Sequence, residues 1–168
     1  MNMSLLRDVE AINREQVERI VERGRRALWV LNGKRIAILG LAFKPGTDDI
    51  RFAPSLQLIK RLLEESAYIQ AYDPKAMAKS KSLFPEVRFC DSALLAAERA
   101  DALVIATEWE EFRRLDWESV RHVMNRPLVL DARNLLKGEE MAAMGFEYHG
   151  VARASSGEPP QFSSGAAG

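Results

Sequence analysis

The segment KRIAILGLA, residues 34–42, is the feature that most restricts the fold of this chain. After two basic residues it is almost entirely apolar, so it lacks the alternation that a strand with one solvated face shows. A strand of this composition is typical of a parallel sheet covered on both faces. The segment therefore predicts a sheet with helices on each side.

The rest of the chain alternates between helix-like and strand-like segments. Apolar residues at helical spacing predict helices at residues 53–65, 75–83, 92–99, 110–124 and 139–144. Short apolar runs between them predict strands at residues 68–73, 87–90, 102–107, 127–132 and 146–151. Such alternation forms βαβ units, whose right-handed crossovers close into a doubly wound sheet. We therefore predict an α/β, Rossmann-like fold with a mostly parallel sheet and helices on both faces.

One long helix is predicted before this sheet, over about residues 5–30. Its apolar residues form a single stripe: Leu5, Val9, Ile12, Val17, Ile20, Val21 and Leu28. The stripe must pack against either the domain or a partner helix. We divide the chain into this helix at residues 1–32, an α/β domain at residues 33–153, and a tail at residues 154–168. The tail is rich in Gly, Ser, Pro and Ala, and we expect it to be disordered.

Charge and cysteine content exclude several classes of protein. Lys and Arg total 24 against 24 for Asp and Glu, so the net charge favours neither nucleic acid nor a membrane surface as partner. The single cysteine, Cys90, excludes a disulfide framework and a cysteine-based zinc site, and it fits the cytoplasm. Because Cys90 ends a predicted core strand, we expect a buried, neutral thiol. No apolar run approaches the roughly 20 residues of a membrane span, so we expect a cytoplasmic protein.

Ligands of an open parallel sheet bind beyond the carboxyl ends of the strands, where the strand order reverses. With the order 3-2-1-4-5-6, the loops after the first, fourth and fifth strands converge there. Lys44 and Arg133 would therefore project into one crevice, although they are far apart in sequence. Phosphate oxygens suit this pair, because Lys acts as a point charge and Arg can bind bidentately. Two solvated loop charges are the alternative.

The crevice does not carry the usual dinucleotide fingerprint. In G-x-G-x-x-G the glycines let the backbone approach the pyrophosphate, whereas Gly40 is followed here by LAFK. A ribose-binding acid follows that fingerprint by ~20 positions, and Asp73 lies well beyond this distance. We therefore interpret Asp73-Pro74 as a turn, and we expect phosphate binding without a standard NAD site.

Five segments occur in an order that identifies a family: GKRIAILGLAFKPGTDDIR, AYDPKAM, ADALVIATEWEEFRRLDW, VLDARNLL and GFEYHGVAR. Together they resemble the C-terminal, UDP-binding domain of the UDP-glucose 6-dehydrogenase family, within the UDP-glucose/GDP-mannose dehydrogenases. FKPGTDDIR combined with TEWEEF is closer to the UDP-glucose enzymes than to the GDP-mannose enzymes. The segment LLRDVEAINREQ is similar to the end of the central helix through which these enzymes dimerise.

The resemblance implies an enzyme in which an NAD-binding domain, a helical middle and this domain act together. Such enzymes oxidise UDP-glucose to UDP-glucuronate with two NAD, through a thioester on a catalytic cysteine. By motif, Phe43, Lys44 and Arg133 would bind the UDP-sugar, and Asp49 would brace the loop. Arg51 would reach the NAD pyrophosphate across the interdomain cleft. UDP-glucose or UDP would be the ligand, and residues 1–32 would pair with those of a second copy in a homodimer.

The sequence departs from the family pattern in several places. The NAD domain and the glycine-rich cysteine motif are absent from it, so we expect no catalytic residue and no bound NAD in this chain, and no turnover by the chain alone. His122 and His149 lack the spacing of metal ligands, so we expect no metal site. A free-standing, non-catalytic module for nucleotide-sugar binding or dimerisation is the alternative. Ser66 also stands where the family usually has glycine, and Phe52 where it often has glutamate.

Overall fold

The computed structural model describes residues 3–151, apart from the side chains of Leu6 and Val9. The tail predicted at residues 154–168 lies outside the described residues. In chain order, the strands are β1 (Arg35–Leu39), β2 (Tyr68–Tyr72), β3 (Arg88–Phe89), β4 (Ala102–Ile105), β5 (Leu128–Asp131) and β6 (Glu147–Gly150). The helices are α1 (Met3–Leu28), α2 (Pro54–Glu64), α3 (Met77–Lys81), α4 (Ala93–Ala97), α5 (Glu110–Arg113), α6 (Trp117–Val123) and α7 (Gly138–Ala143). Each predicted segment contains an observed element, and the region at residues 110–124 holds two helices.

The described strands form one six-stranded sheet in the order β3-β2-β1-β4-β5-β6. Every neighbouring pair in it is parallel. The predicted fold class is therefore confirmed, and the strand order is the one that was assumed in locating the crevice. The order reverses between β1 and β4, which places the loops after β1, β4 and β5 at one edge of the sheet.

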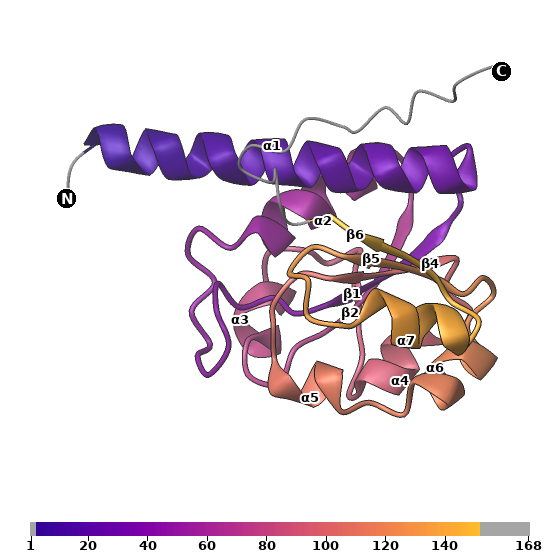
Figure 1. Ribbon diagram of the computed structural model, residues 1–168. Coiled ribbons are helices and arrows are strands. Elements are labelled where there is room, and N and C mark those ends of the chain that lie inside the picture. The colour runs from indigo at the N-terminus through magenta and orange to yellow at the C-terminus, as the bar shows by residue number, and fades with distance from the viewer. Residues whose placement is uncertain (1–2, 152–168) are drawn as a thin grey trace, which may run out of the picture.

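Helices α1 and α2 lie on one face of the sheet, and α4, α5, α6 and α7 lie on the other (Figure 1). An apolar cluster fills each of the two interfaces. Ile36 and Ile38 of β1 belong to the cluster beneath α1 and α2. Ala37 and Leu39 belong to the cluster formed with α4, α5, α6 and α7. Successive side chains of a strand point to opposite faces, and both faces here are buried. This double burial is the physical reason that β1 is apolar without alternation.

Helix α1 lies along α2 and extends beyond the sheet at its N-terminal end (Figure 1). Val17, Ile20 and Val21 are buried against the domain, whereas Leu5 and Ile12 are 57% and 65% exposed. Of the residues in the predicted stripe, those in the second half of α1 therefore pack on the domain, whereas Leu5 and Ile12 remain exposed. In residues 3–151, neither α1 nor any shorter helix combines the length and the apolar character needed to cross a membrane.

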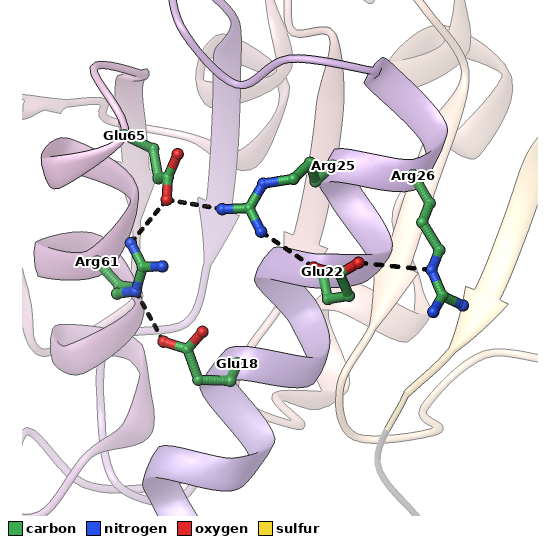
Figure 2. Close-up of polar contacts among 6 residues, drawn as sticks. All are labelled: Glu18, Glu22, Arg25, Arg26, Arg61 and Glu65. Carbon is green, nitrogen blue, oxygen red and sulfur yellow. Dashed lines mark hydrogen bonds and ion pairs between the residues drawn. The ribbon is translucent and has the colours of Figure 1, made fainter.

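A chain of ion pairs also joins α1 to α2 (Figure 2). Carboxylates and guanidinium groups alternate along it: Glu18, Arg61, Glu65, Arg25, Glu22 and Arg26. The hydrogen bond from Arg61 lowers the pKa of Glu65. Each exposed ion pair contributes about 0–1 kcal/mol, whereas each buried Val or Ile side chain contributes about 1.5–3 kcal/mol. The apolar contacts of α1 therefore supply most of its attachment, and the ion pairs supplement them.

Gly40 allows the loops that follow β1 and β4 to approach each other closely. Its φ of +101° lies in the region that favours glycine. A Cβ built on Gly40 would lie 2.5 Å from Cβ and 2.6 Å from the backbone nitrogen of Thr107. The Thr107 hydroxyl also donates a hydrogen bond of 2.7 Å to the carbonyl of Ala42. The backbone after β1 is therefore held directly against the loop after β4.

We expect Gly40→Ala to lower the free energy of unfolding by about 2–4 kcal/mol, because it adds a steric clash to backbone strain. Equilibrium urea denaturation measures this loss. Gly33→Ala is the matched control: Gly33 has a φ of +76°, but a Cβ added there would meet nothing within 4 Å beyond its chain neighbours, so strain alone should cost about 1 kcal/mol. Equal losses in the two variants would contradict the close approach to Thr107.

Candidate functional site

The buried carboxylate of Asp73, directly after β2, organises the carboxyl edge of the sheet. One oxygen accepts hydrogen bonds from the backbone N–H groups of Leu41 and Ala42, at 2.7 and 3.0 Å, and from the Trp109 indole at 3.0 Å. The other accepts two backbone N–H groups of the following turn, at 2.8 Å each. The predicted turn at Asp73 is confirmed. Its carboxylate additionally fixes the loops after β1 and β4, a role that was not predicted from the sequence.

Asp131 anchors the loop after β5 in a similar way. One oxygen accepts the backbone N–H of Arg133 at 3.0 Å. The other accepts the N–H of Leu136 at 2.9 Å and the Tyr148 hydroxyl at 2.7 Å. Burial raises the pKa of Tyr148, so its hydroxyl keeps the proton that it donates. The backbone that carries Arg133 is therefore tied to both β5 and β6.

Asp49 braces the loop after β1, as expected. Its carbonyl accepts the Phe43 N–H at 2.7 Å, which closes the loop at its base. Its carboxylate accepts the Arg51 N–H at 2.9 Å and two guanidinium bonds at 2.9 and 3.1 Å. These side-chain bonds from Arg51 lower the pKa of Asp49 from 3.8 to about 2. The Arg51 side chain remains 80% exposed.

A cleft of about 490 Å³ lies at this edge of the sheet. Phe43, Lys44 and Arg133 all line it, together with Glu108 from the loop after β4. The rest of the lining is Ile12, Asn13, Glu15, Gln16 and Arg19 of α1, with Pro54 of α2. The structure thus brings together the three residues that were predicted to bind the UDP-sugar. Arg51 does not line the cleft. A larger groove of about 720 Å³ along α1 contains none of the loops after β1, β4 and β5.

The wall that α1 contributes to the cleft was not predicted from the sequence. The Gln16 amide donates to the carbonyl of Ala132 at 3.2 Å, and the Asn13 amide donates to the carbonyl of Phe52 at 2.9 Å. These bonds tie α1 to the loops after β5 and β1. The signal in the sequence was a pair of uncharged polar residues three positions apart, which lie on one face of a helix.

The charges in the cleft are of both signs. Arg133 Nε forms an ion pair with Glu108, and Arg19 lies 3.9 Å from Glu15. Lys44 forms no ion pair with any residue between positions 3 and 151. The cleft therefore contains one unpaired cation and two cations that already have an acidic neighbour.

Cys90 lies outside the cleft, just after β3. Its side chain is buried and free of any disulfide. Burial raises the pKa of the Cys90 thiol, which favours the neutral form. The predicted burial of Cys90 is confirmed.

Comparisons with known proteins agree with this geometry. A family model described as the UDP-glucose/GDP-mannose dehydrogenase family, UDP binding domain, matches residues 37–138. A UDP-glucose 6-dehydrogenase of Pseudomonas aeruginosa is 43% identical over 165 residues, which cover 91% of this chain and 35% of the relative. One of Rickettsia bellii is 41% identical over 123 residues, which cover 72% of this chain and 28% of the relative.

A solved UDP-glucose dehydrogenase from Pyrobaculum islandicum has the same fold, with a TM-score of 0.71 and 29% identity. The match covers 84% of this chain and 30% of that protein. This chain therefore spans about a third of the length of the relatives that it matches. The region matched by the family model begins within β1, contains β2 to β5, and includes the loops that carry Phe43, Lys44 and Arg133. The chain belongs to the UDP-glucose/GDP-mannose dehydrogenase family, as its UDP binding domain.

Proposed function

We propose that the cleft binds the diphosphate of UDP-glucose, and that this chain is the substrate-binding part of an NAD-dependent UDP-glucose 6-dehydrogenase. The supporting observation is that Phe43, Lys44 and Arg133 line one cleft although they come from distant parts of the sequence. A lysine and an arginine can share the charge of two phosphates through charge-assisted hydrogen bonds. Phe43, which is 45% exposed, offers an aromatic surface to the uracil or sugar ring.

Oxidation of UDP-glucose to UDP-glucuronate through a thioester needs a reactive thiolate and a bound nicotinamide. Cys90 is the single thiol of this sequence, and its burial and raised pKa oppose thiolate formation. We propose that the chain alone binds the substrate without oxidising it. In the intact enzyme, other parts would supply the thiol and the NAD-binding domain, and NAD would supply the hydride acceptor.

Arg51 is the residue proposed to meet the NAD pyrophosphate. Its guanidinium group is exposed and lies outside the UDP cleft. The bonds to Asp49 use Nε and Nη2, which leaves Nη1 free to donate to a phosphate. Asp49 would thus hold Arg51 at the loop surface, where a second domain could present its cofactor.

We further propose that α1 pairs with a second copy of the chain. The exposure of Leu5 and Ile12 on its first half supports this, because these apolar residues are seven positions apart and so share one face of the helix.

Lys44→Ala and Arg133→Ala should each weaken UDP binding by about 1.5–3 kcal/mol, because each removes a charge-assisted contact to phosphate. Titration calorimetry should show this as a rise in Kd of about 10- to 150-fold. Lys60→Ala is the control, since Lys60 is an exposed cation on α2 that does not line the cleft. Unchanged affinity in both cleft variants would reject this cleft as the UDP site.

The purified chain, mixed with UDP-glucose and NAD, should produce no NADH, because it has no reactive thiolate to carry the thioester. The measurement is absorbance at the NADH band, with an intact UDP-glucose 6-dehydrogenase as the positive control. Sustained NADH formation by this chain would contradict the proposal that it binds without oxidising.

Arg51→Ala should return the pKa of Asp49 from about 2 toward 3.8, which NMR titration of the carboxyl carbon can follow. The folded pKa is depressed, so the stabilising contribution of this pair is complete above about pH 3.8 and is lost as the pH falls through about 2. UDP affinity should stay unchanged in Arg51→Ala, because Arg51 does not line the cleft. A pKa of Asp49 that stays near 2 in the variant would show that Arg51 is not its cause.

A further inference from the structure

Glu108 already forms an ion pair with Arg133, the arginine that is proposed to bind phosphate. Its Oε2 forms an ion pair with Nε of Arg133, and both side chains line the cleft. Glu108 stands between two anchored residues. The hydroxyl of Thr107 bonds to Ala42, and the indole of Trp109 bonds to the buried Asp73. The backbone of Glu108 is therefore fixed, and only its side chain has freedom to move away from Arg133.

A carboxylate and a phosphate compete for the same edge of a guanidinium group. Arginine binds an anion bidentately through pairs of neighbouring N–H groups, and Glu108 takes the Nε position of one such pair. The Arg133 and Glu108 side chains are 37% and 33% exposed, so solvent screens their attraction. Because solvent screens this pair, a ligand of higher charge can replace Glu108 as the partner of Arg133.

Lys44 provides the internal comparison. It contributes to the same cleft but has no ion-pair partner within residues 3–151. A diphosphate could therefore bind Lys44 directly, whereas Arg133 must first break its ion pair with Glu108.

We infer that Glu108 is a built-in counter-ion of Arg133, which the diphosphate of the ligand displaces on binding. This inference rests on the proposed function and assigns Glu108 a positioning role. Without ligand, Glu108 holds the guanidinium group in the cleft. With ligand, the phosphate takes its place, and the affinity observed for UDP is reduced by the work of breaking the Glu108–Arg133 pair.

The test is titration calorimetry of UDP with the full chain and with Glu108→Gln, which removes the charge and keeps the size of the side chain. Glu108→Gln should bind UDP about three- to tenfold more tightly, because Arg133 no longer has to break an ion pair before it binds phosphate. The gain should persist in the Lys44→Ala background. In the Arg133→Ala background it should fall below about twofold, because the competing partner is gone.

Glu15→Gln is the matched control, since Glu15 lines the same cleft but has Arg19 as its neighbour. An equal gain from Glu15→Gln, or an equal gain in both double variants, would show a general charge effect and overturn the inference. Weaker UDP binding by Glu108→Gln would also overturn it, because Glu108 would then assist the ligand. If the chain binds UDP and Glu108→Gln binds no more tightly, the inference fails alone. If neither binds UDP, the proposed function fails with it.

Discussion

The carboxylate of Asp73 accepts five hydrogen bonds in a fully buried position, and the arrangement of the cleft depends on it. A buried carboxylate is tolerated only where such donors replace water. The donors come from the loops after β1 and β4 as well as from the turn after β2, so three chain segments are fixed relative to one another. Gly40 also lets the loops after β1 and β4 lie in contact, because it has no side chain to separate its backbone from Thr107.

The cleft combines an edge of the sheet with a helix that lies outside the βαβ pattern. Asp73 and Asp131 position the loops that carry Lys44 and Arg133, while Asn13 and Gln16 fasten α1 above them. The buried second half of α1 and its ion pairs with α2 hold this wall in place (Figure 2). The shape of the cleft and the attachment of α1 are therefore linked through the same few contacts. A change in how α1 packs would therefore alter the cleft, because residues of α1 line it.

Much of the fold and part of the site could be predicted from the sequence. Apolar periodicity located each strand and helix, and the handedness of crossovers predicted a doubly wound sheet. With the order 3-2-1-4-5-6, such a sheet places Lys44 and Arg133 at one edge. The exposure of Leu5 and Ile12 and the pairing of Glu108 with Arg133 could not be predicted in this way. Ser66 shows the boundary between the two, because its φ of +61° lies in the region that favours glycine, and that angle is a property of the folded turn.

The sequence by itself determined the order of elements, the double burial of the central strand and the edge at which cations gather. These follow from local periodicity and from rules of chain connection that act over a few residues or one βαβ unit. The tertiary structure decided which cation of the cleft has an acidic partner among residues 3–151, and that α1 forms one wall of the cleft. Ion pairs and hydrogen bonds require atoms about 3–4 Å apart, and such distances between remote segments exist only after the sheet and its helices have packed.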